Sequence, residues 1–256
     1  MLTVDLNCDM GEGISTDEAI YPLISSANIA CGGHAGDART MRASTERALQ
    51  HGVAVGAHPS YPDRAGFGRA DILETGAGKG DRLLSFRGLR EQLARQIEAL
   101  QGICLETGAH LHHVKPHGAL YNRAAKDPAV ARIIAETVKA AGDSILLYGL
   151  SGSVMRAAAV DAGLRFVSEA FADRTYRRDG TLTPRSEPDA LIAHDATMLE
   201  QVLMIIRQGR VRAADGALVS LAVDTLCLHG DGPNAVRFAT VLRRELDCNG
   251  IAVAFP

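Results

Sequence analysis

Four histidines share one local context, because each lies beside a glycine or a proline just after a short apolar run. They are His34, His58, His117 and His229. Carboxylates occupy the same kind of segment at Asp9, Glu12 and Asp37. Neutral imidazoles and carboxylates can bind a divalent metal such as zinc or manganese, and they can also move protons. The pattern therefore predicts either a metal centre or a hydrogen-bonded polar ring without metal.

Asp9, His58 and His117 are the ligand set that fits a divalent cation best. Three protein ligands leave coordination positions for water or substrate, as catalytic metal sites require. His34 and His229 could add ligands or act as acid–base groups. The residue types alone do not decide between these two roles for His34 and His229.

Lys115 stands inside an apolar run, where an ammonium group needs a partner. It could pair with Glu169 or Asp9, bind an anionic part of a substrate, or only orient its neighbours. Arg174 and Arg185 could hold a carboxylate or a phosphate through parallel hydrogen bonds.

Short apolar and β-branched runs predict seven strands separated by longer helical patterns. The predicted strands cover residues 2–8, 27–31, 53–57, 111–115, 144–149, 165–170 and 218–228. Apolar residues at helical spacing predict helices around 89–100, 128–138, 198–206 and 236–246, and His194 is expected within a helix.

Strand followed by helix, repeated about seven times, predicts an α/β fold with a mainly parallel sheet. The sheet either closes into a barrel or stays open with helices on both faces. In both arrangements the side chains just past the carboxyl ends of the strands face one site. Because the candidate residues follow predicted strands, we expect them to converge there.

Length and composition narrow the class of protein. The 256 residues suit a single β/α-barrel domain, with no linker that would divide 1–256. A net charge of -3, a mixed charge pattern and the lack of Trp argue against nucleic-acid and membrane partners. Five scattered cysteines without a CxxC pair, and no signal-peptide pattern, predict a cytoplasmic protein.

One connection is unusually long. Residues 61–87 are rich in Gly, Asp and Arg, which predicts a lid, a binding loop or a mobile insertion. The sequence has no GxxxxGK[ST], GxGxxG or GxSxG motif that would indicate a phosphate-binding loop, a dinucleotide site or a serine nucleophile.

Six segments resemble the motifs of the LamB/YcsF family. They are DLNCDMGE (5–12), SANIACGGHAGD (26–37), GAHPSYPD with GFGR (56–63, 66–69), VKPHGALYN (114–122), EAFADRTY (169–176) and CLHGD (227–231). They stand in the family's order and cover nearly the whole chain. The connection at 70–86, which includes TGAGKG (75–80), looks longer than the family pattern.

The resemblance implies a seven-stranded β/α barrel of the glycoside hydrolase/deacetylase type. It also implies ATP-driven opening of 5-oxoproline to glutamate together with B and C subunits. Within the matched segments we expect catalytic residues at Glu12, His34, Asp37 and Lys115, substrate-binding residues at Asn7, Asn28, Glu169, Arg174 and His229, and metal ligands at Asp9, His58 and His117.

Two other functions remain open. The chain could be a stand-alone metal-dependent deacetylase or amidohydrolase acting on a small sugar or amide. It could also be a non-catalytic subunit that presents substrate. The sequence leaves a homo-oligomer open and does not say which subunit binds ATP.

Overall fold

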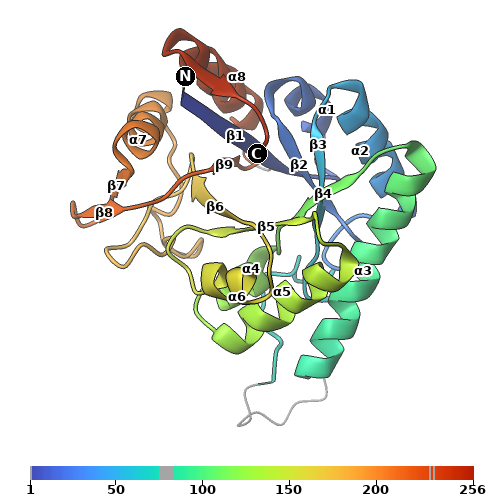
Figure 1. Cartoon of the computed structure of the whole chain (residues 1–256). Coiled ribbons are helices and arrows are strands. Elements are labelled where there is room, and N and C mark those ends of the chain that lie inside the picture. The colour runs from blue at the N-terminus through green and yellow to red at the C-terminus, as the bar shows by residue number, and fades with distance from the viewer. Residues whose placement is uncertain (1, 75–82, 231, 233) are drawn as a thin grey trace.

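A ring of seven parallel strands forms the centre of the computed structural model, which describes residues 2–74, 83–230, 232 and 234–256 (Figure 1). The ring strands are β1 (Leu2–Met10), β2 (Ser26–Ala30), β3 (Ala54–His58), β4 (Leu111–Val114), β5 (Leu146–Leu150), β6 (Phe166–Phe171) and β9 (Thr225–Leu228). β1 pairs with both β2 and β9, so the sheet closes on itself. The predicted seven-stranded barrel is confirmed, and the open sheet is excluded.

β1 is long enough to serve two partners along one edge. Its first residues pair with β10 (Ile251–Val253), and Asp5 to Cys8 pair with β9. The prediction of one strand over 218–228 is wrong. Its first part, β8 (Leu218–Ser220), pairs antiparallel with β7 (Arg210–Arg212) outside the barrel. Between β8 and β9, the Asp224 carboxylate accepts a hydrogen bond from the Ser168 amide of β6, which ties this connection to the ring.

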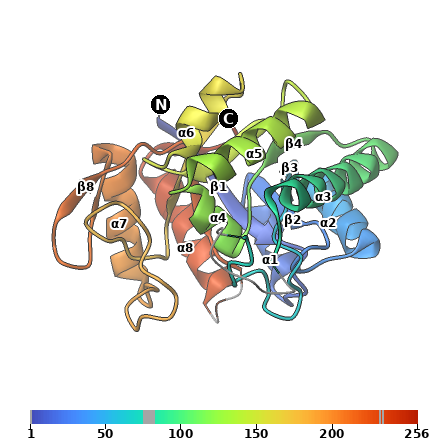
Figure 2. The same ribbon diagram turned by 90° about the horizontal axis from the view of Figure 1, so that it is seen from below.

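The helices lie outside the strands (Figure 2). They are α1 (Asp17–Ile20), η1 (Tyr21–Leu23), α2 (Ala38–Gln50), α3 (Phe86–Thr107), α4 (Gly118–Ala124), α5 (Pro128–Ala141), α6 (Met155–Asp161), α7 (Asp195–Gln208) and α8 (Ala235–Cys248). The four predicted helices are confirmed as α3, α5, α7 and α8. His194 occupies the N-cap position just before α7, without a side-chain capping hydrogen bond, and does not lie inside the helix. None of the described helices combines the length and apolar character needed to cross a membrane.

Polar side chains fill the interior of the barrel around Asp5, in the first half of β1. The Asp5 carboxylate accepts hydrogen bonds from the hydroxyls of Ser25 (2.6 Å), Ser26 (2.8 Å), Thr225 (2.7 Å) and Tyr148 (3.0 Å). Burial raises the pKa of Asp5 above its ordinary value, and the four donors only partly offset that effect. The interior is therefore a hydrogen-bonded layer instead of an aliphatic one.

Gly56 in β3 makes room for an imidazole in this layer. His113 stacks on Tyr148 with ring centroids 4.0 Å apart, and a Cβ on Gly56 would lie 2.0 Å from His113 Nε2. His113 Nε2 in turn hydrogen-bonds Asn28 Oδ1 at 2.8 Å. A side chain at position 56 would displace the ring and break the link to Asn28.

Gly56→Ala should therefore lower the free energy of unfolding by about 1–3 kcal/mol, the usual cost of overpacking. Gly102→Ala is the matched control, because a Cβ at this helical glycine in α3 meets nothing within 4 Å. That control should be neutral or stabilising by up to about 1 kcal/mol. Chemical denaturation of both variants measures the difference, and equal stabilities would contradict the packing argument.

Candidate active site

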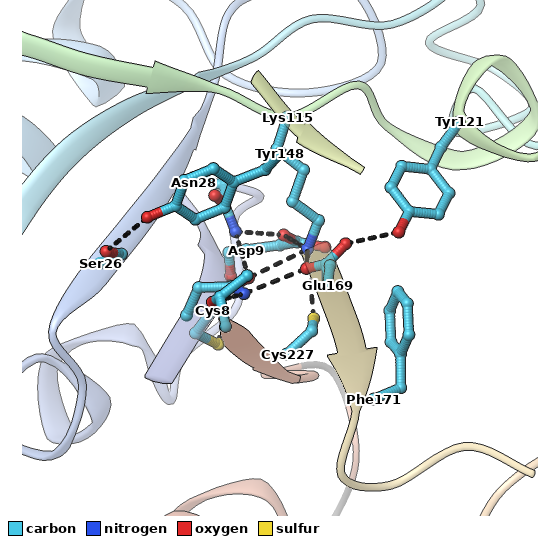
Figure 3. A network of polar contacts seen from close by, with 12 residues as sticks. Cys8, Asp9, Ser26, Asn28, Lys115, Tyr121, Tyr148, Glu169, Phe171 and Cys227 are labelled. Carbon is cyan, nitrogen blue, oxygen red and sulfur yellow. Dashed lines mark hydrogen bonds and ion pairs between the residues drawn. The ribbon is translucent and has the colours of Figure 1, made fainter. Parts of the chain in front are cut away.

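Lys115 directly follows β4 and is almost fully buried at the carboxyl end of the barrel, with 3% of its surface exposed. Figure 3 shows its side chain pointing at Asp9, Glu169 and Cys227. Its ammonium lies 2.8 Å from Glu169 Oε1 and 3.0 Å from Asp9 Oδ1, and it donates to Asn7 Oδ1 at 3.1 Å. Burial alone would lower the pKa of Lys115, but the neighbouring Asp9, Cys227 and Glu169 raise it well above its ordinary value. Lys115 therefore stays positively charged and is saturated by protein partners.

Asn7, Asn28 and Glu169 lie behind this ammonium and have no exposed surface. Asn28 Nδ2 donates to Asn7 Oδ1 (2.8 Å) and Asp9 Oδ1 (2.9 Å), and Asn7 Nδ2 donates to Glu169 Oε1 (3.0 Å). Tyr121 completes the network by donating to Glu169 Oε2 at 2.6 Å. The three side chains contact Lys115, Asp9 or one another, so in this structure they orient Lys115 and Asp9, and their expected role in substrate binding stays a prediction.

The other oxygen of Asp9 faces an imidazole. Asp9 Oδ2 lies 3.3 Å from His58 Nε2. Burial raises the pKa of Asp9, but His58 and Lys115 together lower it well below its ordinary value. For His58, burial lowers the pKa and Asp9 more than reverses this, so the net direction is upward. Asp9 thus lies between the Lys115 ammonium and the His58 imidazole, and both neighbours favour its ionised form.

Three imidazoles and Glu12 gather beside Asp9. His34 Nε2 lies 2.9 Å from Glu12 Oε1, and His117 Nδ1 lies 3.5 Å from the same oxygen. The rings of His34 and His117 stack at 3.7 Å, and the two nitrogens His117 Nδ1 and His58 Nε2 are 2.9 Å apart. One ligand atom from each of Glu12, His34, His58 and His117 falls within 4.8 Å of all the others.

Backbone carbonyls fix the tautomers of two of these rings. His58 Nδ1 faces the Lys115 carbonyl at 2.7 Å, and His117 Nε2 faces the Phe67 carbonyl at 2.9 Å. A carbonyl only accepts, so each of those nitrogens carries hydrogen. The lone pairs of His58 Nε2 and His117 Nδ1 then point at one another, and a proton or a metal cation must separate them.

The charges of the cluster also favour a cation. Burial, followed by the effect of His58, lowers the pKa of His34 to about 3 and that of His117 to about 2, so both rings are neutral at pH 7. The carboxylates of Asp9, Glu12 and Glu169 are opposed by the single ammonium of Lys115, so negative charge is in excess before His58 is considered. Neutral imidazoles whose outer nitrogen bonds a carbonyl are the usual form of metal ligands. The donor set thus fits a divalent cation.

Two of the three predicted metal ligands lie together in the structure, and the third has other partners. His58 and His117 converge as expected, whereas Asp9 is shared with Lys115 and Asn28. Glu12 and His34, predicted as catalytic residues, lie closer to the two histidines. The fourfold group of Glu12, His34, His58 and His117 is therefore the better candidate metal site.

A cavity of about 510 Å³ opens above this cluster. Asp9, Glu12, His58, Lys115 and His117 line its inner end. Its described walls also carry four cations: Arg69, Lys126, Arg174 and Arg185. The cavity therefore offers acid–base groups at one end and positive charge for an anionic ligand elsewhere.

Arg174 is the buried member of these cations. Its guanidinium donates to the carbonyls of Thr183 and Ala190, and no described carboxylate lies within ion-pair distance of it. Burial, with a smaller effect of Arg185, lowers its pKa from the ordinary arginine value. A buried cation that faces a cavity with only neutral partners suits an anionic ligand.

His229 and Asp173 form a dyad on the cavity wall. His229 Nδ1 lies 2.9 Å from Asp173 Oδ1, and the His229 amide donates to Asp173 Oδ2 at 3.1 Å. Burial would raise the pKa of Asp173, but the contacts with His229 lower it overall. The carboxylate orients the ring with its other nitrogen available for acid–base chemistry.

Asp37 lies apart from the cluster. Its carboxylate caps α2 by accepting hydrogen bonds from the amide and hydroxyl of Thr40. It lines a second hollow of about 330 Å³, together with Glu12, His34 and Phe67. Its local role is a helix cap, and the structure does not bring it to the main cavity.

Three residues without a predicted role support the site: Tyr121, Thr225 and Phe67. Tyr121 and Thr225 bond Glu169 and Asn7, and Phe67 holds His117. Phe67 stands between Gly66 and Gly68, a flank that indicates a tight turn. Part of the predicted long connection, 75–80 included, lies outside the described residues, and so does Asp231 of the sixth segment.

Comparisons with known proteins identify the family of this chain and agree with its barrel fold. The LamB/YcsF family model matches residues 4–256. A protein of Bordetella parapertussis, named as the A subunit of 5-oxoprolinase, is 50% identical over 255 residues, covering 98% of this chain and 97% of the relative. A relative of the same name from Tolumonas auensis is 48% identical and covers 99% of both chains. The crystal structure of a lactam utilization protein from Thermus thermophilus superimposes with a TM-score of 0.88 at 41% identity, over 99% of both chains.

Lys115→Met should destabilise the fold by about 3–5 kcal/mol, because it leaves Asp9 and Glu169 buried without their cation. The deficit should be largest near neutral pH. In the wild type the low pKa of Asp9 adds stability above the ordinary carboxyl range, and this is lost as the pH falls through the folded pKa. In the variant, acid instead removes an unpaired charge, so the two proteins should converge on acidification.

Denaturation curves at several pH values measure this effect. Lys139→Met is the control, because Lys139 pairs with Asp143 at the surface and its loss should change stability by less than about 1 kcal/mol. A pH-independent deficit in the Lys115 variant would contradict the charge argument.

Proposed function

This chain belongs to the LamB/YcsF family, and on that premise we propose that it is the A component of an ATP-dependent 5-oxoprolinase. The reaction would open the lactam 5-oxo-L-proline to L-glutamate with hydrolysis of ATP. The observation that carries the proposal is the similarity to relatives named as the A subunit of 5-oxoprolinase. The alignments cover nearly the whole chain, and about half of the aligned residues are identical. Because that name implies an assembly, the proposal includes B and C partner subunits.

The cavity suits this substrate. 5-oxoproline has an uncharged ring amide and a carboxylate, so it needs a cation at one end and acid–base groups at the other. Arg174 would pair with the carboxylate, because it faces the cavity and its hydrogen-bond partners among the described residues are neutral carbonyls. Lys115 is less suited to that role, since Asp9 and Glu169 already saturate it.

Hydrolysis of the lactam adds water to the amide carbon and protonates the departing ring nitrogen. Asp9 would accept a proton from the attacking water, since it lines the cavity and lies beside the imidazole group without belonging to it. His229, oriented by Asp173, would donate a proton to the ring nitrogen. A divalent cation held by Glu12, His34, His58 and His117 would supply Lewis acidity at the carbonyl oxygen.

An unstrained lactam resists hydrolysis at neutral pH, and coupling to ATP would overcome this barrier. The additional cations Arg69, Lys126 and Arg185 would donate hydrogen bonds to phosphoryl oxygens in the same cavity. The proposal also includes a cytoplasmic location, which the unpaired cysteines support.

The same acid–base groups could hydrolyse an amide without nucleotide, which keeps a stand-alone deacetylase or amidohydrolase as the alternative. The deciding assay measures glutamate and ADP formation from 5-oxoproline and ATP, with and without the partner chains. Activity that needs both ATP and partners supports the proposal. Turnover of N-acetyl sugars by the isolated chain without ATP would replace it with the alternative.

His58→Ala and His117→Ala should each lower 5-oxoproline turnover in the reconstituted complex by at least about 100-fold. Both variants should also retain less divalent metal in elemental analysis of the purified chain, because each removes one of the four candidate ligand atoms that lie within 4.8 Å of one another. Arg178→Gln, which removes an exposed surface ion pair with Asp215, is the control. Folded variants with wild-type turnover would rule out this site.

Asp173→Asn should lower kcat by about 10²–10⁴-fold and change KM little, because the amide no longer fixes the tautomer of His229. Asp215→Asn, at an exposed ion pair, is the matched control and should keep full activity. Steady-state kinetics of the complex measure both. A change confined to KM would show that His229 binds substrate and does not transfer the proton.

A further inference from the structure

Phe67 has the only positive φ among the described non-glycine residues, at 54°. A bulky side chain is strained in this left-handed region, which glycine enters freely. Both of its neighbours are glycines, so a glycine-only turn was accessible to this segment. Phe67 therefore carries a local conformational cost that a glycine would avoid, and such strain often accompanies function.

The turn around Phe67 is held from several sides. Gly68 donates from its amide to the Asp63 carbonyl at 2.8 Å, and the Gly68 carbonyl accepts from the Ala119 amide at 3.0 Å. A Cβ on Gly118 would lie 2.6 Å from that carbonyl oxygen, so the turn lies directly against the start of α4. These contacts fix the peptide that follows Phe67 relative to His117, the residue before α4.

The backbone and the ring of Phe67 both touch the imidazole cluster. The Phe67 carbonyl accepts from His117 Nε2 at 2.9 Å. The ring meets His34 and His117 edge-on, with centroids 5.3 Å and 5.5 Å away, and the Arg69 guanidinium lies 5.0 Å above it. Phe67 and Glu12 are also the residues that line both the main cavity and the second hollow.

We propose that Phe67 is a positioning residue, whose strained backbone and ring hold His117 in the Nε2–H tautomer with Nδ1 directed at His58 and Glu12. The carbonyl selects the tautomer because it can only accept a hydrogen bond. The ring keeps the carbonyl in place by filling the wall between the two hollows. No ligand of the cluster is supplied by Phe67 itself, so it acts only through His117.

Phe67→Gly is the sharpest test, because it relieves the backbone strain and removes the ring. Side-chain ¹⁵N spectra of the full-length chain, treated with chelator, distinguish the protonated and unprotonated nitrogens of His117. The wild type should show a single Nε2–H tautomer, and the variant a mixture of both. In the reconstituted complex kcat should fall by about 100-fold with KM little changed, as expected for a misplaced catalytic group.

Phe67→Leu separates the two parts of the proposal. It keeps apolar bulk in the wall and keeps the strained backbone, so His117 should remain mainly in the Nε2–H tautomer and kcat should fall less than in the glycine variant. Phe86→Leu, at the exposed first residue of α3, is the control for loss of a phenylalanine. Unfolding curves of all variants show whether any change follows from lost stability.

The proposal is overturned if Phe67→Gly keeps a single His117 tautomer, or if kcat falls only in proportion to lost stability. The kinetic arm rests on the proposed 5-oxoprolinase activity, whereas the spectroscopic arm does not. A wild-type complex that fails to turn over 5-oxoproline would therefore refute the function and leave the tautomer result to decide the role of Phe67.

Discussion

The buried ammonium of Lys115 is the constraint on which the rest of the site depends. Its charged form is favoured because Asp9 and Glu169 lie within 3.0 Å, and these carboxylates come from β1 and β6, the two strands that flank β9 in the ring. Each then needs further donors, which Asn7, Asn28 and Tyr121 supply. One charge thus orients side chains from several strands. The carboxyl end of the barrel is therefore closed by a hydrogen-bonded polar network and not by aliphatic side chains.

This polar network determines the charge around the neighbouring imidazoles His34, His58 and His117. The inner carboxylates exceed the ammonium groups, so the imidazoles next to them must share a proton or a cation. Burial drives His34 and His117 toward the neutral form, while Asp9 favours the charged form of His58. The same arrangement that costs folding energy therefore prepares neutral nitrogen ligands and an ionised carboxylate side by side. This preorganisation is the physical reason why the cluster suits Lewis-acid or acid–base chemistry on an amide.

Sequence reasoning could predict the parts of this structure that follow from periodicity. Continuous apolar runs and helical spacing locate the barrel strands and the longer helices, and topology alone brings His58, His117 and His229 to one end. It could not predict β7 or β10, because three-residue strands carry too little pattern. It could not predict that Asn7, Asn28 and Glu169 are buried and hydrogen-bonded to one another or to Asp9, since residue type does not reveal whether a polar group meets solvent or another side chain. Asp37 shows a related limit, because an acid before a helix serves equally well as a cap.

The alternation in β1 carries a signal for the buried network. Asp5, Asn7 and Asp9 are separated by the apolar Leu6 and Cys8, and a period of two places all three on one face of the strand. In this barrel that face is the interior, where Asp5 bonds Thr225, Asn7 bonds Glu169 and Asp9 meets Lys115. Polar residues on the inward face of a fully buried strand cannot be left unpaired, so each demands a donor or a charge from a neighbouring strand. A polar alternation in a strand otherwise surrounded by apolar sequence therefore predicts a network that crosses the barrel, in which hydroxyls satisfy Asp5 and the Lys115 ammonium satisfies Asp9.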